Sequence, residues 1–478
     1  MFRLYKLVKR YWWQLAIIVV LVATQTLLQL QLPDYITTTQ NIVNNIGETG
    51  ITRAEINEML KQSGIMLLIS LGIFALAAGQ GSLNSKFVAT LGKEIRAEVF
   101  KKVENFSLSD VNEFGTASLL TRLINDSRAV QEFAFMVNRV FIMSPIFLII
   151  GSVKLLTLDP MYFYVVIVII PLIIIVLIIT FAVASPLFTQ IQERVDYVTL
   201  LLREGLTGVR VIRAFNQEER ENRFFDEGNR KMTDIIIKVS NVMQIISPII
   251  NILFNLVFFG IYLIGFVLFD KMFLGVIPFS QTITAMMYAQ HIMMSFMMLS
   301  FTFIMFPRVK VSAKRINAVL NVKPNIVDPE APLDKELIDT GIVKFENVTF
   351  TFSDLEHPTL KNINFTAEPG TTTAIVGSTG SGKSSIINLL PRFFDASVGK
   401  VTFDGYDVRD FKLNDLRDKI GFVPQTAVLF KGTIRDNLRF GNENATDEEM
   451  WEALRVAQAA GFVSKLELGL DAPVAQGG

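Results

Sequence analysis

The chain has 478 residues with a net formal charge of zero, and its hydrophobic residues (51%) far outnumber its charged residues (19%). This length calls for two or more domains, and the composition, with a mean hydropathy of +0.42, favours membrane burial over a soluble enzyme. The zero net charge gives no indication of a nucleic-acid partner, and the absence of cysteine excludes disulfides, Cys-ligated zinc and a thiol nucleophile.

Six apolar stretches in the first two thirds of the chain are long enough to cross a bilayer, which takes about 20 residues. Open strands cannot pair their backbone groups in lipid, so each stretch is predicted to be a helix. The basic N-terminal ten residues, followed by Tyr11, Trp12 and Trp13, predict a segment at the membrane interface. The predicted spans are 12–32, 60–83, 136–158, 162–184, 245–269 and 277–303.

The distribution of Lys and Arg predicts how these spans are oriented. The connection between the first two spans carries several acids against Arg53 alone, so we expect it to lie outside the cell. Segments 85–135 and 185–244 are rich in Lys and Arg and are expected inside, together with both termini; the other outer connections, at Asp159-Pro160 and Asp270-Lys271, are short. The expected location is the cytoplasmic membrane, with a multi-pass chain surrounded by the lipid bilayer.

Residues 1–320 are therefore predicted to form an all-α, six-helix transmembrane domain. Apolar positions at helical spacing continue through 86–104 and 193–225, so the helices are expected to continue well past the membrane and to turn back deep in the cytosol. Prolines and acids mark 321–340 as a linker. Residues 341–478 are predicted to form an α/β domain, with a capped helix starting at Thr446 and strands at 343–345, 348–352, 400–404 and 420–423.

The most informative motif is the segment 377–384, Gly-Ser-Thr-Gly-Ser-Gly-Lys-Ser, which fits the phosphate-loop spacing G-x-x-x-x-G-K-[ST]. Its glycines let the backbone approach phosphate, Lys383 supplies charge to the β- and γ-phosphates, and the Ser384 hydroxyl can ligate Mg²⁺. A chance Gly/Ser-rich turn is disfavoured because a predicted buried strand (373–376) precedes the loop and a predicted helix (385–390) follows it. The predicted nucleotide site comprises Gly377, Ser378, Thr379, Gly380, Ser381, Gly382, Lys383, Ser384 and Ser385.

Further segments match one family. Phe350-Thr351-Phe352 corresponds to an aromatic loop and 421–425 (Gly-Phe-Val-Pro-Gln) to a Q-loop, and similar matches are found at 429–437, 114–126 and 206–216. Over almost its whole length the chain resembles half-transporters of the ATP-binding cassette exporters, of the multidrug or lipid type. The resemblance implies that ATP and Mg²⁺ are the cofactors and that Phe352 stacks on adenine in place of the usual Tyr. It also implies that Lys383 and Gln425 are catalytic, with Gln425 and Ser384 at the metal.

The chain departs from this family in one respect. The family's signature sequence, its Walker B strand ending in Asp-Glu and its switch His are not found. The two histidines, His291 in the sixth span and His357 before the phosphate loop, are in the wrong places for the switch. Gly478 falls about where the signature would begin, so we expect a nucleotide-binding domain that is truncated at its C-terminus. We do not expect this stretch alone to hydrolyse ATP efficiently.

The resemblance implies an ATPase that drives export as a dimer with a second half-transporter, and a heterodimer is favoured. Because the spans are poor in charge, the expected substrate is a hydrophobic or amphipathic small molecule, drug-like or lipid. The Met-rich sixth span suits an apolar cavity, but the same residues could equally pack against neighbouring helices. Two alternatives stay open: a lipid flippase, and a regulatory, weakly hydrolysing subunit of a heterodimer.

Overall fold

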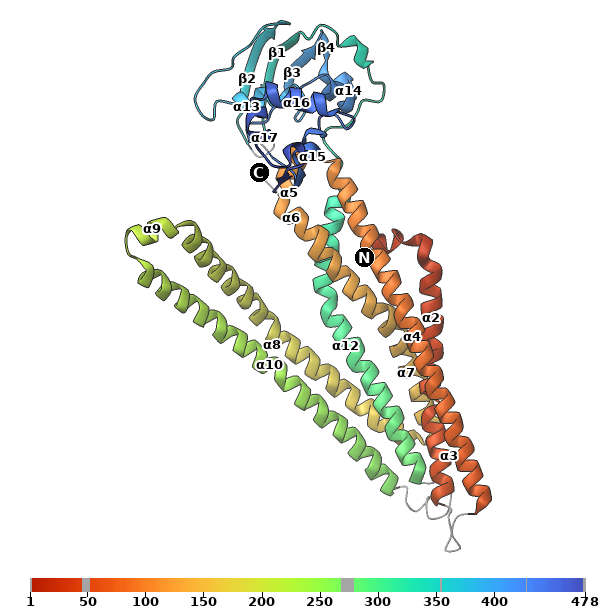
Figure 1. Cartoon of the computed structure of the whole chain (residues 1–478). Coiled ribbons are helices and arrows are strands. Elements are labelled where there is room, and N and C mark those ends of the chain that lie inside the picture. The colour runs from red at the N-terminus through yellow and green to blue at the C-terminus, as the bar shows by residue number, and fades with distance from the viewer. Residues whose placement is uncertain (1, 45–51, 268–278, 353–354, 427, 476–478) are drawn as a thin grey trace. The chain divides into compact units, whose positions relative to one another are not determined.

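The computed structural model describes residues 2–44, 52–267, 279–352, 355–426 and 428–475 (Figure 1). Two compact units form. The helical unit comprises Met1–Asn105 and Val111–Lys323, and the α/β unit comprises Phe106–Asp110 and Pro324–Gly478. The division at Lys323 falls inside the stretch that the sequence predicts to be a linker, 321–340.

Long helices make up the helical unit. Within the described residues, six segments are long and apolar enough to cross a membrane, as predicted: Lys9–Val43, Arg53–Glu104, Thr116–Leu158, Pro160–Thr207, Glu218–Phe266 and Ser280–Asn321. The helices are α1 (Phe2–Lys6), η1 (Lys9–Tyr11), α2 (Trp12–Gln29), α3 (Leu32–Asn44), α4 (Arg53–Glu104), α5 (Leu108–Phe114), α6 (Thr116–Thr121), η2 (Arg122–Asp126), α7 (Ser127–Leu158), α8 (Pro160–Thr207), α9 (Val209–Ala214), α10 (Glu218–Val267) and α12 (Phe279–Asn321). The outer turn predicted at Asp270-Lys271 lies outside the described residues.

Local sequence determines where two of the long helices begin. Thr52 caps α4: its hydroxyl accepts from the Glu55 N–H at 3.3 Å, and the Glu55 carboxylate accepts from the Thr52 N–H at 2.8 Å. Asp159 caps α8 by accepting from the Met161 N–H at 2.8 Å, and Pro160 occupies the first helical position, where its missing N–H costs nothing. The connection predicted at Asp159-Pro160 is thus a single residue between α7 and α8.

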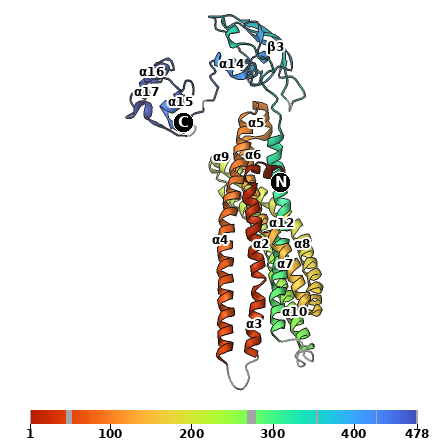
Figure 2. The ribbon, with the colours of Figure 1, turned by 90° about the vertical axis from the view of Figure 1, so that its right-hand side faces the viewer.

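The helices extend well beyond the thickness of a membrane. α4 has 52 residues and is about 78 Å long at 1.5 Å per residue, against roughly 30 Å for the hydrocarbon core of a bilayer. This confirms the predicted extension over 86–104. Over 193–225 the chain turns back, as predicted: α8 ends at Thr207, the short α9 follows, and α10 starts at Glu218 and packs along α8. α8 and α10 lie side by side with α9 at their tip (Figures 1 and 2).

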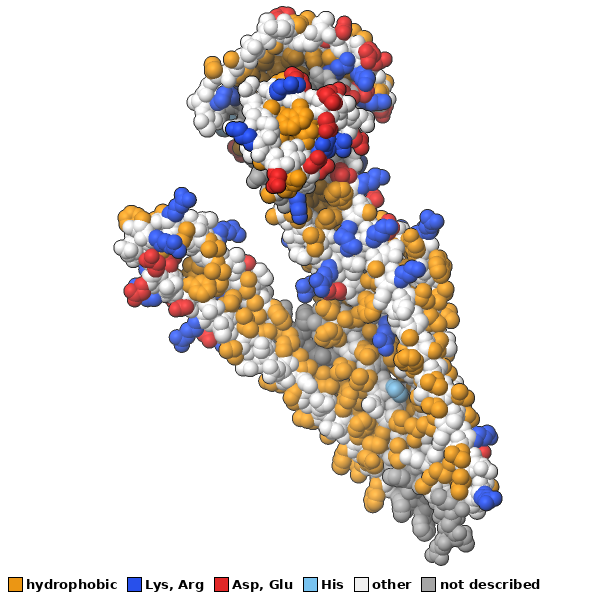
Figure 3. All heavy atoms as spheres, viewed as in Figure 1, with side chains coloured by type: hydrophobic (Ala, Val, Ile, Leu, Met, Phe, Trp, Pro, Cys, Tyr) orange, Lys and Arg blue, Asp and Glu red, His pale blue; other side chains and the backbone are white. Residues whose placement is uncertain are grey.

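The outward surface of the long helices is apolar. Leu68 and Phe74 on α4 are 69% and 72% exposed. On the face shown in Figure 3, hydrophobic side chains cover the middle of α8, α10 and α12, whereas charged side chains gather around α9. An apolar surface of this extent is costly in water and stable in lipid, so the helical unit is suited to a bilayer.

Polar side chains join α3 to α12 over three successive helical turns. The Tyr288 hydroxyl donates to Asp34 Oδ1 at 2.6 Å. Hydrogen bonds also link the members of two further pairs, Thr37 with Thr284 and Asn41 with Ser280. In an apolar medium such bonds replace the water that these groups would otherwise require, so they fix the register of the two antiparallel helices.

One turn of the bundle is wound more widely than an α-helix. η2 is a π-helical turn between α6 and α7, and it lies against α12. The Asp126 carboxylate in this turn accepts from the Ser312 hydroxyl at 2.7 Å, and Arg122 donates to the carbonyl oxygen of Arg315 at 3.1 Å. The wide turn is therefore bonded to its neighbour at both of its ends.

The α/β unit contains a four-stranded antiparallel sheet in the order β2-β1-β3-β4 and a pair of short strands, β5 and β6. Phe345 of β1 lies opposite Phe365 of β2 and Val401 of β3, and packs in one core with Leu389. The elements are η3 (Lys335–Leu337), β1 (Val343–Phe350), β2 (Leu360–Ala367), α13 (Lys383–Leu389), β3 (Val398–Phe403), β4 (Tyr406–Asp407), η4 (Val408–Asp410), α14 (Leu413–Asp418), β5 (Gly432–Thr433), α15 (Ile434–Leu438), α16 (Asp447–Val456), α17 (Ala460–Val463), η5 (Gly469–Asp471) and β6 (Pro473–Val474).

Two predicted strands are wrong. Residues 373–376 and 420–423 lie outside every described strand, and Val376 and Val423 are 88% and 92% exposed instead of buried. A strand is stable only when a neighbour pairs with its backbone, and no described strand pairs with either run. The predicted strands 343–345 and 348–352 form the single strand β1, which ends at Phe350, and the predicted strand 400–404 corresponds to β3. The capping box of Thr446 and Glu449 starts α16, as predicted.

Candidate nucleotide-binding site

The phosphate loop turns at two glycines in the left-handed conformation. Gly380 and Gly382 have φ angles of +83° and +87°, which residues with a Cβ rarely adopt. Gly382 is also the N-cap of α13, and a Cβ at this position would lie 2.6 Å from Leu360 Cδ2 and 3.2 Å from the Thr359 carbonyl oxygen. Glycine is therefore required at 382 on two independent grounds, and the loop backbone packs directly against the start of β2.

Lys383 begins α13, and its ammonium folds over the loop. Its Nζ donates to the carbonyl oxygens of Gly377 at 3.0 Å and Ser378 at 2.6 Å. Ser384 is exposed on the first turn, and Ser385 beside it is buried. The loop thus brings together the first N–H groups of a helix, one cation and one hydroxyl, which is the donor set that suits the phosphates of a nucleotide.

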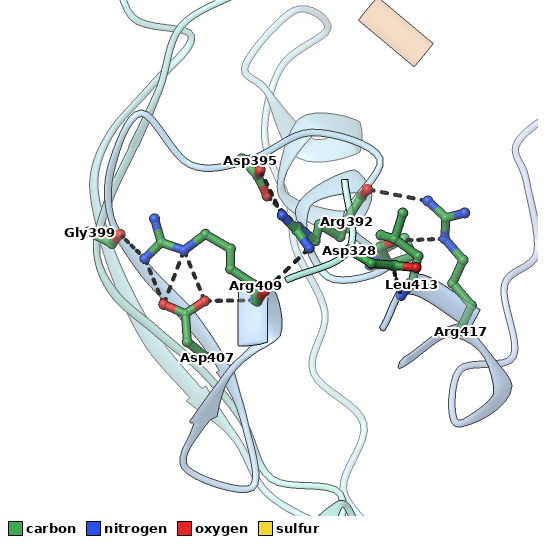
Figure 4. Close-up of polar contacts among 9 residues, drawn as sticks. Asp328, Arg392, Asp395, Gly399, Asp407, Arg409, Leu413 and Arg417 are labelled. Carbon is green, nitrogen blue, oxygen red and sulfur yellow. Dashed lines mark hydrogen bonds and ion pairs between the residues drawn. The ribbon is translucent and has the colours of Figure 1, made fainter. Parts of the chain in front are cut away.

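Two arginines form hydrogen bonds in the turn that follows α13 (Figure 4). Arg417 donates from Nε to the Pro391 carbonyl oxygen at 3.0 Å and from Nη2 to that of Arg392 at 3.3 Å. Its guanidinium also lies over the Phe393 ring. Burial lowers the pKa of Arg417. Arg392, only 6% exposed, donates to both carboxylate oxygens of Asp395 at 2.9 and 3.3 Å. These contacts fix the turn that follows α13 and hence the direction in which the helix presents the loop.

Two further contacts in Figure 4 secure the neighbouring segments. Arg409 Nη2 lies 2.6 Å from Asp407 Oδ2, and hydrogen bonding to this carboxylate raises the pKa of Arg409. Asp328 accepts from the backbone N–H of Leu413 at 2.8 Å, at the start of α14. The predicted linker is therefore bonded to the α/β unit at Asp328.

Asp404 forms hydrogen bonds with the segment that leads into β1. Its carboxylate accepts from the backbone N–H groups of Asp339, Thr340, Gly341 and Ile342, at 2.6 to 3.0 Å, and from the Thr340 hydroxyl at 2.6 Å. Desolvation on its own would raise the pKa of Asp404, but these hydrogen bonds together outweigh it and lower the pKa to about 2.

The structure brings the predicted loop residues Gly377 to Ser385 together at the start of α13, where a helix is predicted. Phe352 follows β1, and its ring packs edge-on against Phe350 and Phe394, with centroids 4.7 and 5.3 Å away. Gln425 is exposed at the end of the unpaired run 420–424, and no hydrogen bond joins it to the loop within the described residues. The roles predicted for these two residues therefore remain predictions.

Sequence reasoning missed the residues that support the loop from behind. Thr359 and Leu360 pack against Gly382, and Arg417 anchors the end of α13. The glycine-rich motif predicts that another segment packs closely against the loop backbone, but it does not identify that segment. Arg417 belongs to no motif, and its contacts lie about 25 residues away along the chain.

Comparison with protein families assigns both parts of the chain. Residues 15–296 match the family described as the ABC transporter transmembrane region, and residues 360–470 match the family described as ABC transporter. The chain belongs to the ABC transporter family. It is an ATPase that couples nucleotide hydrolysis to transport, built as a half-transporter with six candidate membrane spans.

Curated relatives of this ABC transporter are longer than the chain. It is 33% identical over 467 residues to an uncharacterized ABC transporter ATP-binding protein of Mycobacterium tuberculosis, covering 97% of this chain and 78% of that protein. It is 26% identical over 425 residues to an ATP-dependent lipid A-core flippase of Syntrophus aciditrophicus, covering 88% and 69%. An Atm1-family ABC exporter from a bacterium, solved with ATP bound, has the same fold, with a TM-score of 0.79 at 18% identity over 98% of this chain and 80% of that one.

Proposed function

We propose that this ABC transporter exports hydrophobic or amphipathic small molecules, drug-like or lipid, across the cytoplasmic membrane. The supporting observation is that the apolar middle of the described spans contains few charged side chains. Lys154 on α7 pairs with Asp34 on α3 at 2.5 Å, and His291 stacks flat on Phe147 with ring centroids 4.9 Å apart. A strongly charged solute would need compensating charges inside the bundle, where isolated charges are costly.

The methionines of α12 fit the same substrate class. Met293 is buried between helices and contributes to packing, whereas Met294 is 36% exposed. Flexible, polarizable side chains adapt to apolar ligands of different shape. The set comprises Met286, Met287, Met293, Met294, Met297 and Met298.

For the nucleotide, we assign the phosphates of ATP to the loop 377–385 and the charge on the γ-phosphate to Lys383. Ser384 and Gln425 would hold Mg²⁺, which neutralises phosphate charge when bound. Phe352 would offer its ring face to adenine, because the edge-on packing of Phe350 and Phe394 keeps the ring in one orientation.

The partner is a second half-transporter, and we favour a non-identical one. Both termini are assigned to the cytoplasm, because the long segments rich in Lys and Arg lie on the same side as the termini. In this arrangement each nucleotide would be shared between two chains, so that closure of the nucleotide domains moves the membrane helices.

Replacing Lys383 by Ala in the complete transporter, reconstituted in proteoliposomes, tests the assignment. We expect Mg·ATP hydrolysis and uptake of an uncharged lipophilic dye, Nile red, to fall together, because the γ-phosphate loses its cation. Lys361→Ala, which removes an exposed Lys on β2, is the matched control and should leave both unchanged. Normal hydrolysis and transport in Lys383→Ala would refute the assignment, and normal hydrolysis with lost transport would favour the regulatory-subunit alternative.

A lipid flippase is the second candidate, since relatives at 26% and 29% identity are named ATP-dependent lipid A-core flippases. The same proteoliposomes can carry a fluorescent phospholipid. ATP-driven loss of this phospholipid from one leaflet, without dye uptake, would select the flippase over the drug exporter.

A further inference from the structure

The N-terminal segment concentrates positive charge on one exposed surface. Arg3, Lys6, Lys9 and Arg10 are all exposed, and the sequence contains no acid before Asp34. Among the described residues no carboxylate forms an ion pair with these four, and the recorded partner of Arg3 is the neutral amide of Asn321.

The N-terminal segment packs against the helical unit. Leu4 on α1 and Val8 in the turn between α1 and η1 are 0% exposed, whereas Lys6, Lys9 and Arg10 are exposed. The two buried side chains therefore anchor the backbone that carries the three cations.

Polar contacts add to this anchor. The Tyr5 hydroxyl donates to Asn138 Oδ1 on α7 at 3.3 Å, and its ring packs on Phe87 of α4 at 6.3 Å between centroids. The Asn138 amide in turn donates to Asn84 Oδ1 at 3.0 Å, and the Asn84 amide donates to the Phe135 carbonyl oxygen at 2.9 Å. A chain of buried and half-buried hydrogen bonds thus connects the N-terminal segment to α4 and α7.

Two tryptophans indicate the depth at which the cations lie. Trp12 and Trp13 follow Arg10 directly, are 46% and 57% exposed, and begin the apolar helix α2. The Trp12 indole N–H donates to the Tyr5 carbonyl oxygen at 3.3 Å. Exposed indoles at the end of a membrane helix lie at the level of the headgroups, so the adjacent cations lie at the level of the lipid phosphates.

We propose that Lys6, Lys9 and Arg10, flanked by Trp12 and Trp13, form a binding surface for anionic phospholipid headgroups. A zwitterionic headgroup has no net charge to offset the three cations, whereas an anionic one does. Each Lys or Arg near an anionic membrane surface strengthens binding roughly fivefold, and salt weakens the attraction. This surface is independent of the transported substrate.

Trp fluorescence reports on this surface directly. The chain has three tryptophans, and Trp451→Phe leaves only the two at the surface. The full-length protein carrying this change is placed in nanodiscs that contain either brominated phosphatidylglycerol or brominated phosphatidylcholine at the same mole fraction. We expect stronger quenching by the anionic lipid, with the preference decreasing as salt is added.

The triple variant Lys6→Gln, Lys9→Gln, Arg10→Gln should lose this preference almost completely. The control variant Arg203→Gln, Arg223→Gln, Arg230→Gln removes the same charge from exposed positions on α8 and α10 and should keep the preference. Equal quenching by both lipids in the parent protein, or an equal loss of preference in both triple variants, would overturn the proposal. All six positions are exposed, so folding, checked by the elution volume of the detergent-solubilised protein, is expected to be unchanged.

Discussion

Lys154 Nζ on α7 lies 2.5 Å from Asp34 Oδ2 on α3, so two residues 120 positions apart in sequence form an ion pair within the helical unit. The Tyr288 hydroxyl of α12 donates to the other carboxylate oxygen. Lys154 lies four residues before the end of α7. A charge near lipid is stabilised by an opposite charge within reach, and Asp34 supplies it here.

Breaking this pair should destabilise the protein. Lys154→Met leaves the Asp34 carboxylate without its cation, and we expect a loss of about 1–2 kcal/mol, below the roughly 2.5–3.5 kcal/mol for a charge at mid-bilayer because both side chains are over a third exposed. Thermal unfolding in lipid nanodiscs measures the loss. The exchanged pair Asp34→Lys with Lys154→Asp should recover much of it, and an unaltered unfolding temperature in Lys154→Met would show that the pair contributes nothing.

Gly382→Ala should abolish nucleotide binding. The substitution combines a φ of +87° with a Cβ 2.6 Å from Leu360, and the backbone strain alone costs about 1–3 kcal/mol. Gly380→Ala has a similar φ but open space around the Cβ, so its effect should be smaller. Titration with a fluorescent ATP analogue gives the affinities. Gly461→Ala on α17, with open space and no positive φ, is the control, and similar affinities for all three variants would contradict the packing argument.

Asp404 should make stability depend on pH in the acid range. Its pKa is about 2 in the folded chain against 3.8 unfolded, so its contribution is complete above pH 3.8 and is lost as pH falls toward 2. Allowing for solvent screening, Asp404→Asn should cost about 1–2 kcal/mol at neutral pH. Unfolding temperatures of both proteins across this range should converge at acid pH. Thr340→Val, which removes one of the five bonds, should show a smaller difference, and curves that remain parallel would exclude this role.

Arg417→Ala should weaken ATP binding, although none of the hydrogen bonds of Arg417 is to the phosphate loop. Two hydrogen bonds from a charged donor to the turn that follows α13 are lost, at about 2 kcal/mol or more, together with the contact over Phe393. We expect a severalfold rise in Kd and a lower unfolding temperature. Lys in place of Arg should restore little, because it cannot bond to two carbonyls in the same geometry. Arg455→Ala, which breaks an exposed ion pair with Glu452, should change neither quantity.

Features that depend on local sequence could be predicted, and features that depend on distant partners could not. The spans and the phosphate loop are recognised from apolar length and residue spacing, and the start of α16 from Thr446 and Glu449. Residues 373–376 have the composition of a strand, but a strand needs a neighbour, and composition does not reveal whether one is present. Likewise, neither Asp34 nor Arg417 carries a local signal of the residue it contacts.

The π-helical turn at η2 stores one residue more than ordinary helical winding needs. Since an α-helix advances about 100° per residue, rewinding this turn would swivel the entire length of α7 by roughly that angle relative to α6. The bonds from Asp126 to Ser312 and from Arg122 to Arg315 oppose such a rotation. Two hydrogen bonds from these five residues therefore fix the rotation of α7 about its own axis relative to α6.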